Sequence, residues 1–178
     1  MSAISLPPPM DVTIRPATPH DLETVSGILL EAARWLTDSG KPMWREEELE
    51  PARIAADVTA GIFFLAECEG EPAGTVKFQL EDPVIWFDVP HEDSACLHRL
   101  AVRRRFAGGR VSSALLQWAV ERTRSLNRRY LRLDCAATRP RLRAIYEGFG
   151  FTHHSNKQIG PYYDARYEYD VTKPWPIG

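Results

Sequence analysis

The segment LHRLAVRRRFAGGRVSSALL, residues 97–116, decides the fold of this chain. Its first six residues are mostly apolar, as in a strand that is buried on both faces of a sheet. A basic turn with two glycines follows, and from Val111 onward apolar side chains recur at helical spacing. A buried strand that runs through such a turn into a helix presents the free amide groups of the helix start to any ligand in the turn.

Three interpretations fit this turn: a site for a phosphate group, a basic surface for nucleic acid, or a turn without a ligand. The charge distribution favours an anionic ligand. Thirteen arginines, but only Glu121 and Asp134 as acidic residues, fall between Arg99 and Arg143, although the whole chain has a formal net charge of -2. This asymmetry indicates that the central third of the chain binds an anionic partner.

Nucleic acid fits this region less well than a small anion does. Proteins that bind single strands interleave aromatic side chains with basic ones, and the region lacks both that pattern and a helix-turn-helix pair. The acidic remainder of the chain would repel a long polyanion. Anion or nucleic-acid binding stays an alternative function, which tight and salt-dependent binding to random DNA would support.

The composition indicates one globular domain. The chain has 178 residues, of which 44% are hydrophobic, and this length suits a single domain. No apolar run approaches the roughly 20 residues of a membrane span, and the first ten residues lack the pattern of a signal peptide. We expect a cytoplasmic protein without a membrane partner, with a domain at residues 11–172 and flexible tails at 1–10 and 173–178.

The cysteines and histidines indicate neither a disulfide framework nor a metal site. Cys68, Cys96 and Cys135 lie far apart in apolar runs, as small buried side chains do. His153 and His154 are adjacent, so on a strand they point to opposite faces and make a poor metal pair. We therefore expect no metal.

Periodicity, helix caps and turn residues predict a mixed α/β domain. Helices are expected at residues 18–36, 46–59, 111–125 and 141–149. Strands are expected at residues 11–16, 62–68, 74–80, 84–87, 95–102, 130–135, 151–155 and 165–171. The middle of this order contains two strand-to-helix crossovers. We therefore expect a mixed, mostly antiparallel sheet with a central parallel strand pair and flanking helices.

The opening segment resembles motif A of the GNAT superfamily of N-acetyltransferases. In that motif a strand of pattern LxV leads into a loop of form Q/R-x-x-G-x-G/A, and the following helix binds the pyrophosphate of acetyl-CoA. Leu97–Val102 matches the strand, and SSALLQWAVERT at 112–123 matches the helix. Arg141–Phe151, RLRAIYEGFGF, resembles the second signature, a tyrosine before a GF pair, and Ala32–Trp44 resembles the segment between the first two helices of a bacterial subset.

The resemblance implies a single-domain acyl-CoA N-acyltransferase fold with acetyl-CoA as cosubstrate. It also implies direct attack on the acetyl group, in a ternary complex, by a primary amine of a small molecule or peptide. Acidic stretches such as EEELE at 46–50 would suit a cationic amine. A homodimer is common in this fold and is the assembly to test for this chain.

The loop departs from the motif at three positions. Aligned by its flanks, the motif places Ala107 where glutamine or arginine is usual, and Arg110 and Ser112 at the two small positions. Gly109 and Gly108 stand one and two positions before the first of these small positions. If the turn requires a positive φ at position 110, an arginine there costs roughly 1–2 kcal/mol. Alternatively, the displaced glycines allow the loop to take a shifted path.

By the resemblance, one set of residues would contact the cofactor and another the acceptor. The strand backbone would meet the pantetheine arm, the loop the pyrophosphate, and Arg139 or Arg143 the outer phosphate. The cofactor set is Leu100, Ala101, Val102, Ala107, Gly108, Gly109, Arg110, Val111, Ser112, Ser113, Arg139 and Arg143. Trp35 and Trp44 would line the acceptor site.

Tyr146 and His98 are the candidate catalytic residues. By the resemblance, Tyr146 meets the departing sulfur. A tyrosine pKa of about 10 and a thiol pKa of about 8.5 make full proton transfer uphill by about 2 kcal/mol, so a hydrogen bond is the expected role. His98 has the intrinsic pKa of a general base. Glu92, Asp93 and Asp134 are alternative bases.

The departures in the loop leave a second function open. A chain that has lost part of the usual phosphate contacts could bind acyl-CoA without transferring its acyl group. This non-catalytic module and the enzyme are distinguished by whether any amine receives an acetyl group from the bound cofactor.

Overall fold

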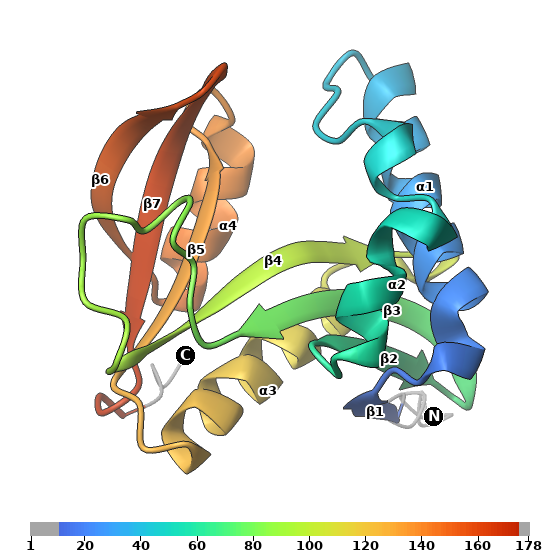
Figure 1. Ribbon diagram of the computed structural model, residues 1–178, viewed down its shortest axis with the longest axis horizontal. Coiled ribbons are helices and arrows are strands. Elements are labelled where there is room, and N and C mark those ends of the chain that lie inside the picture. The colour runs from blue at the N-terminus through green and yellow to red at the C-terminus, as the bar shows by residue number, and fades with distance from the viewer. Residues whose placement is uncertain (1–10, 175–178) are drawn as a thin grey trace, which may run out of the picture.

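The computed structural model describes residues 11–174. The tail predicted at residues 1–10, and all but the first two residues of the tail predicted at 173–178, lie outside the described residues. Within them the chain forms one mixed α/β domain, in which helices flank a seven-stranded sheet (Figure 1). None of the helices between residues 11 and 174 is long and apolar enough to cross a membrane.

The elements follow the predicted order with two exceptions, given below. The strands are β1 (Val12–Pro16), β2 (Phe63–Cys68), β3 (Glu71–Gln79), β4 (Ser94–Val102), β5 (Tyr130–Ala136), β6 (Thr152–Ile159) and β7 (Tyr162–Asp170). The helices are α1 (Leu22–Asp38), α2 (Pro51–Thr59), α3 (Arg110–Ser125) and α4 (Pro140–Phe149), with short 3-10 turns η1 (Pro19–Asp21), η2 (Glu46–Glu48) and η3 (Arg104–Phe106).

The sheet divides into two arms. Its strand order is β1-β2-β3-β4-β5-β7-β6, and β4 and β5 form its one parallel pair. That pairing covers only Ser94–Cys96 against Tyr130–Arg132. Beyond it the two strands diverge, so β1–β4 form one arm and β5–β7 the other (Figure 1). The prediction of a mostly antiparallel sheet with a central parallel pair is confirmed.

A β-bulge interrupts β4 where it leaves β5. Thr75 of β3 pairs with Ala101, but Lys77, two residues on, pairs with His98, three residues back. The extra residue in β4 stands outside the ladder, and Arg99 adopts a left-handed φ of 55°. Such a conformation costs an arginine on the order of 1–2 kcal/mol and is typical of functional sites.

Two hydrophobic clusters hold helices on opposite faces of the sheet. α3 and α4 pack on one face through residues such as Leu115 and Phe149, while α1 and α2 pack on the other through Leu29 and Val58. Gly74 of β3 allows α3 to approach closely, because a Cβ there would lie 3.0 Å from a side-chain atom of α3 and 3.0 Å from a β4 carbonyl. This contact brings the start of α3 beside the end of β4.

Two predicted elements are wrong. The helix expected at 46–59 is split into η2 and α2, because Glu50 precedes Pro51 and is extended, with ψ of 151°. The strand expected at 84–87 is a turn, in which Oδ1 of Asp82 accepts hydrogen bonds from the N–H groups of Val84 and Ile85. This side-chain contact competes with strand pairing.

Candidate active site

The glycines of the turn before α3 set its path. Gly108 and Gly109 have φ of 128° and 91°, and Arg110 is the first helical residue. The loop therefore takes the shifted path, and the strain considered for Arg110 does not arise. The N–H of Ser113 makes the first hydrogen bond of the helix, to the carbonyl of Gly109 at 2.8 Å. The amide groups of the preceding turn of helix are thus available to a ligand.

This turn opens on a groove of about 240 Å³. The groove is lined by Ala32, Trp35, Leu36, Met43, Trp44, Leu100, Ala101, Val102, Arg104, Ala107, Gly108, Gly109 and Ser112. It brings together seven of the residues expected to bind the cofactor and both tryptophans expected to bind the acceptor. Val111 instead lies in the hydrophobic core, and Arg110 and Ser113 are exposed outside the lining.

Arginines stack on both tryptophans of the groove. The guanidinium carbon of Arg104 lies 3.7 Å from the centre of the Trp35 ring, and that of Arg99 lies 5.3 Å from the Trp44 ring. The contact of Arg104 holds positive charge in the groove, whereas Arg99 also forms an ion pair with Glu48 at 3.3 Å. The Ser112 hydroxyl donates to the carbonyl of Gly109 at 3.1 Å. The amide groups at the helix start and the Arg104 guanidinium therefore form the donor set that a pyrophosphate requires. The residues present therefore fit the pyrophosphate of an acyl-CoA.

The two arginines expected at the outer phosphate are engaged elsewhere. Arg139 donates from one nitrogen to the carbonyls of Lys41 and Pro42, and so links the start of α4 to the loop after α1. Arg143 donates to the Tyr167 hydroxyl at 2.8 Å. Neither arginine lines the groove.

A buried cluster of charges lies at the point where β4 and β5 diverge. Nε2 of His98 lies 2.9 Å from Oδ2 of Asp82, and its Nδ1 lies 3.5 Å from Oδ1 of Asp134. The contact with Asp82 is close but falls outside hydrogen-bond angles, so we describe it as an ion pair. Each member of the cluster comes from a different segment: β4, the loop before β4, and β5.

The cluster keeps His98 charged. Burial by itself lowers the pKa of the imidazole, but the adjacent carboxylates of Asp134 and Asp82 outweigh burial and raise it to about 9. Burial raises the pKa of the Asp82 carboxyl, but the adjacent His98 and the N–H groups that Asp82 accepts from outweigh burial, so the pKa is lowered. At neutral pH His98 is an imidazolium without a free lone pair, which argues against the role of general base.

The structure places the other candidate bases at different distances from the point where β4 and β5 diverge. Glu92 and Asp93 precede β4 at the end where it still pairs with β5, and so lie away from the diverging ends of the strands. Asp134 lies at the divergence, in contact with His98. Of the acidic residues proposed from sequence, the structure brings only Asp134 to this point.

Tyr146 lies on α4, on the face opposite His98. It is half-buried and packs on Phe151 and Tyr167, with ring centres 5.9 and 6.2 Å apart. Burial, and to a smaller extent the charges of Cys135 and Asp134, hold its pKa well above the usual value of about 10. Tyr146 is therefore a hydrogen-bond donor and a poor acid.

Sequence reasoning missed two acidic residues near this cluster. Asp82 falls in a loop, and no local pattern connects it with His98. Asp164 falls one residue before the strand predicted at 165–171, whereas β7 begins at Tyr162. The alternation of Asp164 with Arg166 in this strand was the available signal, since it places both side chains on one face.

Comparison with known proteins identifies the family. The Acetyltransferase (GNAT) family model matches residues 29–151. The uncharacterized N-acetyltransferase YesJ of Bacillus subtilis (strain 168) is 33% identical over 144 residues, which cover 76% of this chain and 79% of YesJ. Both matches include the strand, turn and helix that line the groove.

Solved structures share the fold. A GNAT-family acetyltransferase from Listeria monocytogenes 4b F2365 has a TM-score of 0.76 at 24% identity, covering 89% of this chain and 94% of that chain. The PaiA N-acetyltransferase from Thermoplasma acidophilum, in complex with coenzyme A, has a TM-score of 0.69 at 16% identity, covering 90% and 100% of the two chains. The chain described here therefore belongs to the GNAT family of acetyltransferases and is an acyltransferase.

Proposed function

We propose that the enzyme transfers the acetyl group of acetyl-CoA to a primary amine of a small molecule or peptide, by direct attack in a ternary complex. The observation that carries this proposal is the groove in which the amide groups at the start of α3 meet the diverging end of β4. The amide groups at the start of α3 can hold a pyrophosphate. The diverging end of β4 leaves strand backbone accessible to the arm that bears the thioester.

Binding and orientation are the first task of these residues. The turn at Gly108 and Gly109 and the start of α3 hold the pyrophosphate, with Arg104 beside it. Leu100 and Val102 offer backbone groups to the pantetheine arm. Fixing the arm along β4 places the acetyl carbonyl at the bulge, and such positioning removes much of the entropy barrier to reaction.

The bulge at Arg99 and Leu100 has a role in the chemistry. Acetyl-CoA supplies a thioester whose carbonyl oxygen gains negative charge when the amine attacks. A backbone N–H near Leu100 donates to that oxygen, and such a donor contributes about 3–4 kcal/mol to transition-state stabilisation in other enzymes. The left-handed conformation of Arg99 turns the backbone out of the ladder here.

Tyr146 stabilises the departing sulfur by donating a hydrogen bond. Its raised pKa makes full proton transfer to a thiolate more costly than for a free tyrosine. A hydrogen bond needs no such transfer. Attack by a neutral amine forms the C–N bond as the C–S bond breaks, and the proton that the amine then loses balances the charge on sulfur.

The alternative proposal is a module that binds acyl-CoA without transfer. The observation that favours it is Ala107, since alanine replaces the side-chain donor usual at the first position of the loop. Incubation with acetyl-CoA and a panel of primary amines, with release of free thiol as the readout, tests both. Amine-dependent thiol release with matching N-acetylated product supports the enzyme, whereas binding of acetyl-CoA without product from any amine supports the module.

A further inference from the structure

Asp164 is a largely buried residue whose carboxylate has no partner among the described residues. Its residue is 8% exposed, and among residues 11–174 its side chain makes no hydrogen bond or ion pair. Burial, together with the charge of Asp134, raises its pKa to about 6. A buried acidic group is normally paired, because an unpaired charge inside a protein is costly.

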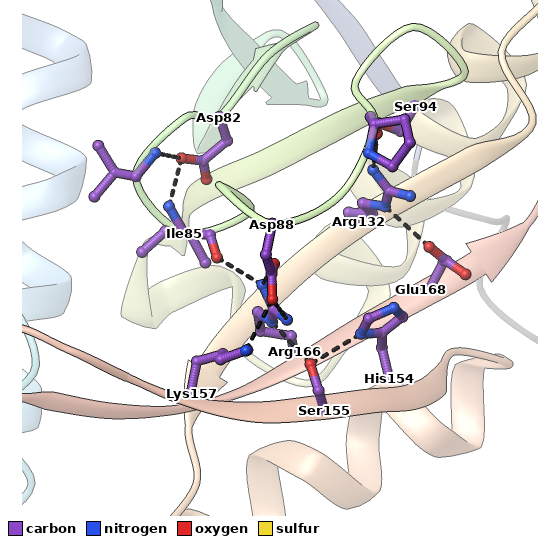
Figure 2. A network of polar contacts seen from close by, with 12 residues as sticks. Asp82, Ile85, Asp88, Ser94, Arg132, His154, Ser155, Lys157, Arg166 and Glu168 are labelled. Atoms are coloured by element: carbon purple, nitrogen blue, oxygen red, sulfur yellow. Dashed lines mark hydrogen bonds and ion pairs between the residues drawn. The ribbon is translucent and has the colours of Figure 1, made fainter.

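The cations nearest to Asp164 on the strands are engaged by another residue. Lys157 of β6 stands directly opposite Asp164, but its Nζ lies 2.8 Å from Asp88. Arg166, on the same face of β7, donates to Asp88 at 2.7 Å and to the carbonyl of Ile85 at 2.9 Å. Figure 2 shows both side chains converging on Asp88.

Five further cations on or near this arm are also engaged, and two of them, Arg129 and Arg132, pair with Asp170 and Glu168. His98 is held between Asp82 and Asp134. Arg139 donates to the loop after α1, and Arg143 to the hydroxyl of Tyr167. Within the described part of the chain, no basic side chain neutralises Asp164. A cation from outside the chain would therefore meet a carboxylate that has no competing partner.

Asp134 connects Asp164 with the proposed reaction centre. Asp134 pairs with Arg166 in the register of β5 and β7, which places Asp134 and Asp164 diagonally adjacent on one face. The charge of Asp134 acts on Asp164 and also on Tyr146, which lies on the opposite face. The divergence of β4 and β5 joins the two faces at this point.

We infer that Asp134 and Asp164 bind the ammonium group of a cationic amine acceptor and that Asp164 takes its proton. This inference rests on the proposed function and adds the charge class of the substrate and the base. One N–H proton passes to the Asp164 carboxylate, and the neutral amine attacks the thioester carbon. The C–S bond breaks as the C–N bond forms. The second proton leaves with the thiol, and Asp164 returns its proton to solvent.

The proposed site favours an alkylamine that is protonated, and therefore positively charged, at pH 7. Asp164 balances the charge of the ammonium before proton transfer, while Asp134 shares the imidazolium of His98 with Asp82. A carboxyl group with a pKa near neutrality gains a proton from an amine more readily than an ordinary aspartate does. An amine that is already neutral at pH 7 gains little from either carboxylate.

Carboxyl NMR tests the site without relying on catalysis. The ¹³Cγ signal of Asp164, assigned with Asp164→Asn, is titrated with pH in the presence of CoA, with and without saturating 1,4-diaminobutane or n-butylamine. We expect the diamine or the amine to lower the apparent pKa of Asp164 by about one unit or more, as a nearby cation does. An Asp164 titration that neither amine shifts would overturn the inference.

Matched variants then test the role in transfer. For an alkylammonium acceptor we expect Asp164→Asn to lower kcat/KM at pH 7 by about a hundredfold, the scale of general base catalysis. We expect a much smaller loss for trifluoroethylamine, which is largely neutral at pH 7. Glu81→Gln is the control, because Glu81 is exposed on the loop before β4 and its side chain makes no hydrogen bond or ion pair among the described residues.

The outcomes separate this inference from the proposed function. Equal losses with both acceptors in Asp164→Asn would show a structural effect and contradict the inference, while transfer itself would stand. Absence of transfer by the wild-type enzyme to every amine would contradict the proposed function, while a shift of the Asp164 titration by the amines would still establish an ammonium site.

Discussion

Nε2 of His98 on β4 and Oδ2 of Asp82 in the preceding loop lie 2.9 Å apart, with both side chains largely buried. The pair fixes the 80–93 loop to the strand at which β4 and β5 diverge. Because Asp134 approaches His98 from β5, one imidazolium ties three segments together. The charge on His98 is therefore a structural element of the site.

Removal of His98 tests this role. We expect His98→Gln to lower the free energy of unfolding by about 3 kcal/mol at pH 6.5, because it leaves the buried Asp82 and Asp134 carboxylates without their cation. The double variant with Asp82→Asn should recover part of the loss. Urea denaturation measures both, and a loss below about 0.5 kcal/mol would show that the cluster does not depend on its charge.

The pH dependence of the free energy of unfolding measures the contribution of the charge on His98. The pKa of His98 is about 9 in the folded protein and about 6.5 when unfolded, so its stabilising contribution is complete below about pH 6.5 and is lost as the pH rises through about 9. Wild-type stability should fall between pH 7 and 10 more steeply than that of His98→Gln. Parallel curves for the two proteins would contradict the raised pKa.

Tyr146→Phe separates turnover from binding. Loss of a hydrogen bond to a charged sulfur should lower kcat by about 10- to 100-fold, since such bonds contribute about 1.5–3 kcal/mol. The affinity for acetyl-CoA should change little. Steady-state kinetics and calorimetry measure the two quantities, with Tyr162→Phe at an exposed position as the control. Unchanged turnover would remove Tyr146 from the mechanism.

The path of the loop depends on Gly109. Its φ of 91° is strained for any residue with a Cβ, so Gly109→Ala should weaken acetyl-CoA binding by roughly 5- to 30-fold, the equivalent of 1–2 kcal/mol. Gly148→Ala is the matched control, because Gly148 lies within α4, has a negative φ and has open space around its Cβ position. Equal affinities of the two variants would show that the turn does not position the cofactor.

Asp164 should lower stability while it supports activity. Its pKa of about 6 exceeds the unfolded value of about 3.9, so the folded protein holds the extra proton and loses stability as the pH rises from about 4 to 6. Asp164→Asn should therefore be more stable than wild type at pH 7, by on the order of 1 kcal/mol, and this gain should vanish near pH 4. Thermal unfolding at both pH values measures this, and a variant less stable at pH 7 would contradict it.

Local patterns in the sequence were sufficient for most of the fold. The spacing of apolar residues from Leu97 to Leu116 predicts a strand, a turn and a helix without knowledge of tertiary contacts, and the structure has all three. The split of the helix expected at residues 46–59 could also have been predicted from Pro51, since the residue before a proline avoids helical conformation. The turn at 84–87 was not, because apolar residues there resemble a strand until the Asp82 contact is known.

The site was only partly predictable. The groove brings Trp35 together with Gly108 and Gly109, and their contacts with the cofactor and the acceptor stay predictions. The charge of His98 could not be foreseen, because it depends on Asp82 and Asp134 approaching from separate segments. The isolation of Asp164 was equally hidden, because it follows from where the neighbouring cations find their partners.

Calorimetric titration of acetyl-CoA into the protein at moderate salt, beside CoA that lacks its 3′-phosphate, measures whether the turn before α3 binds the cofactor. We expect saturable one-to-one binding of acetyl-CoA at micromolar or tighter affinity, weakened by Gly109→Ala and unaffected by Gly148→Ala. No detectable heat, together with no thermal stabilisation by acetyl-CoA, would contradict this expectation, because the groove at the start of α3 would then not be a cofactor site.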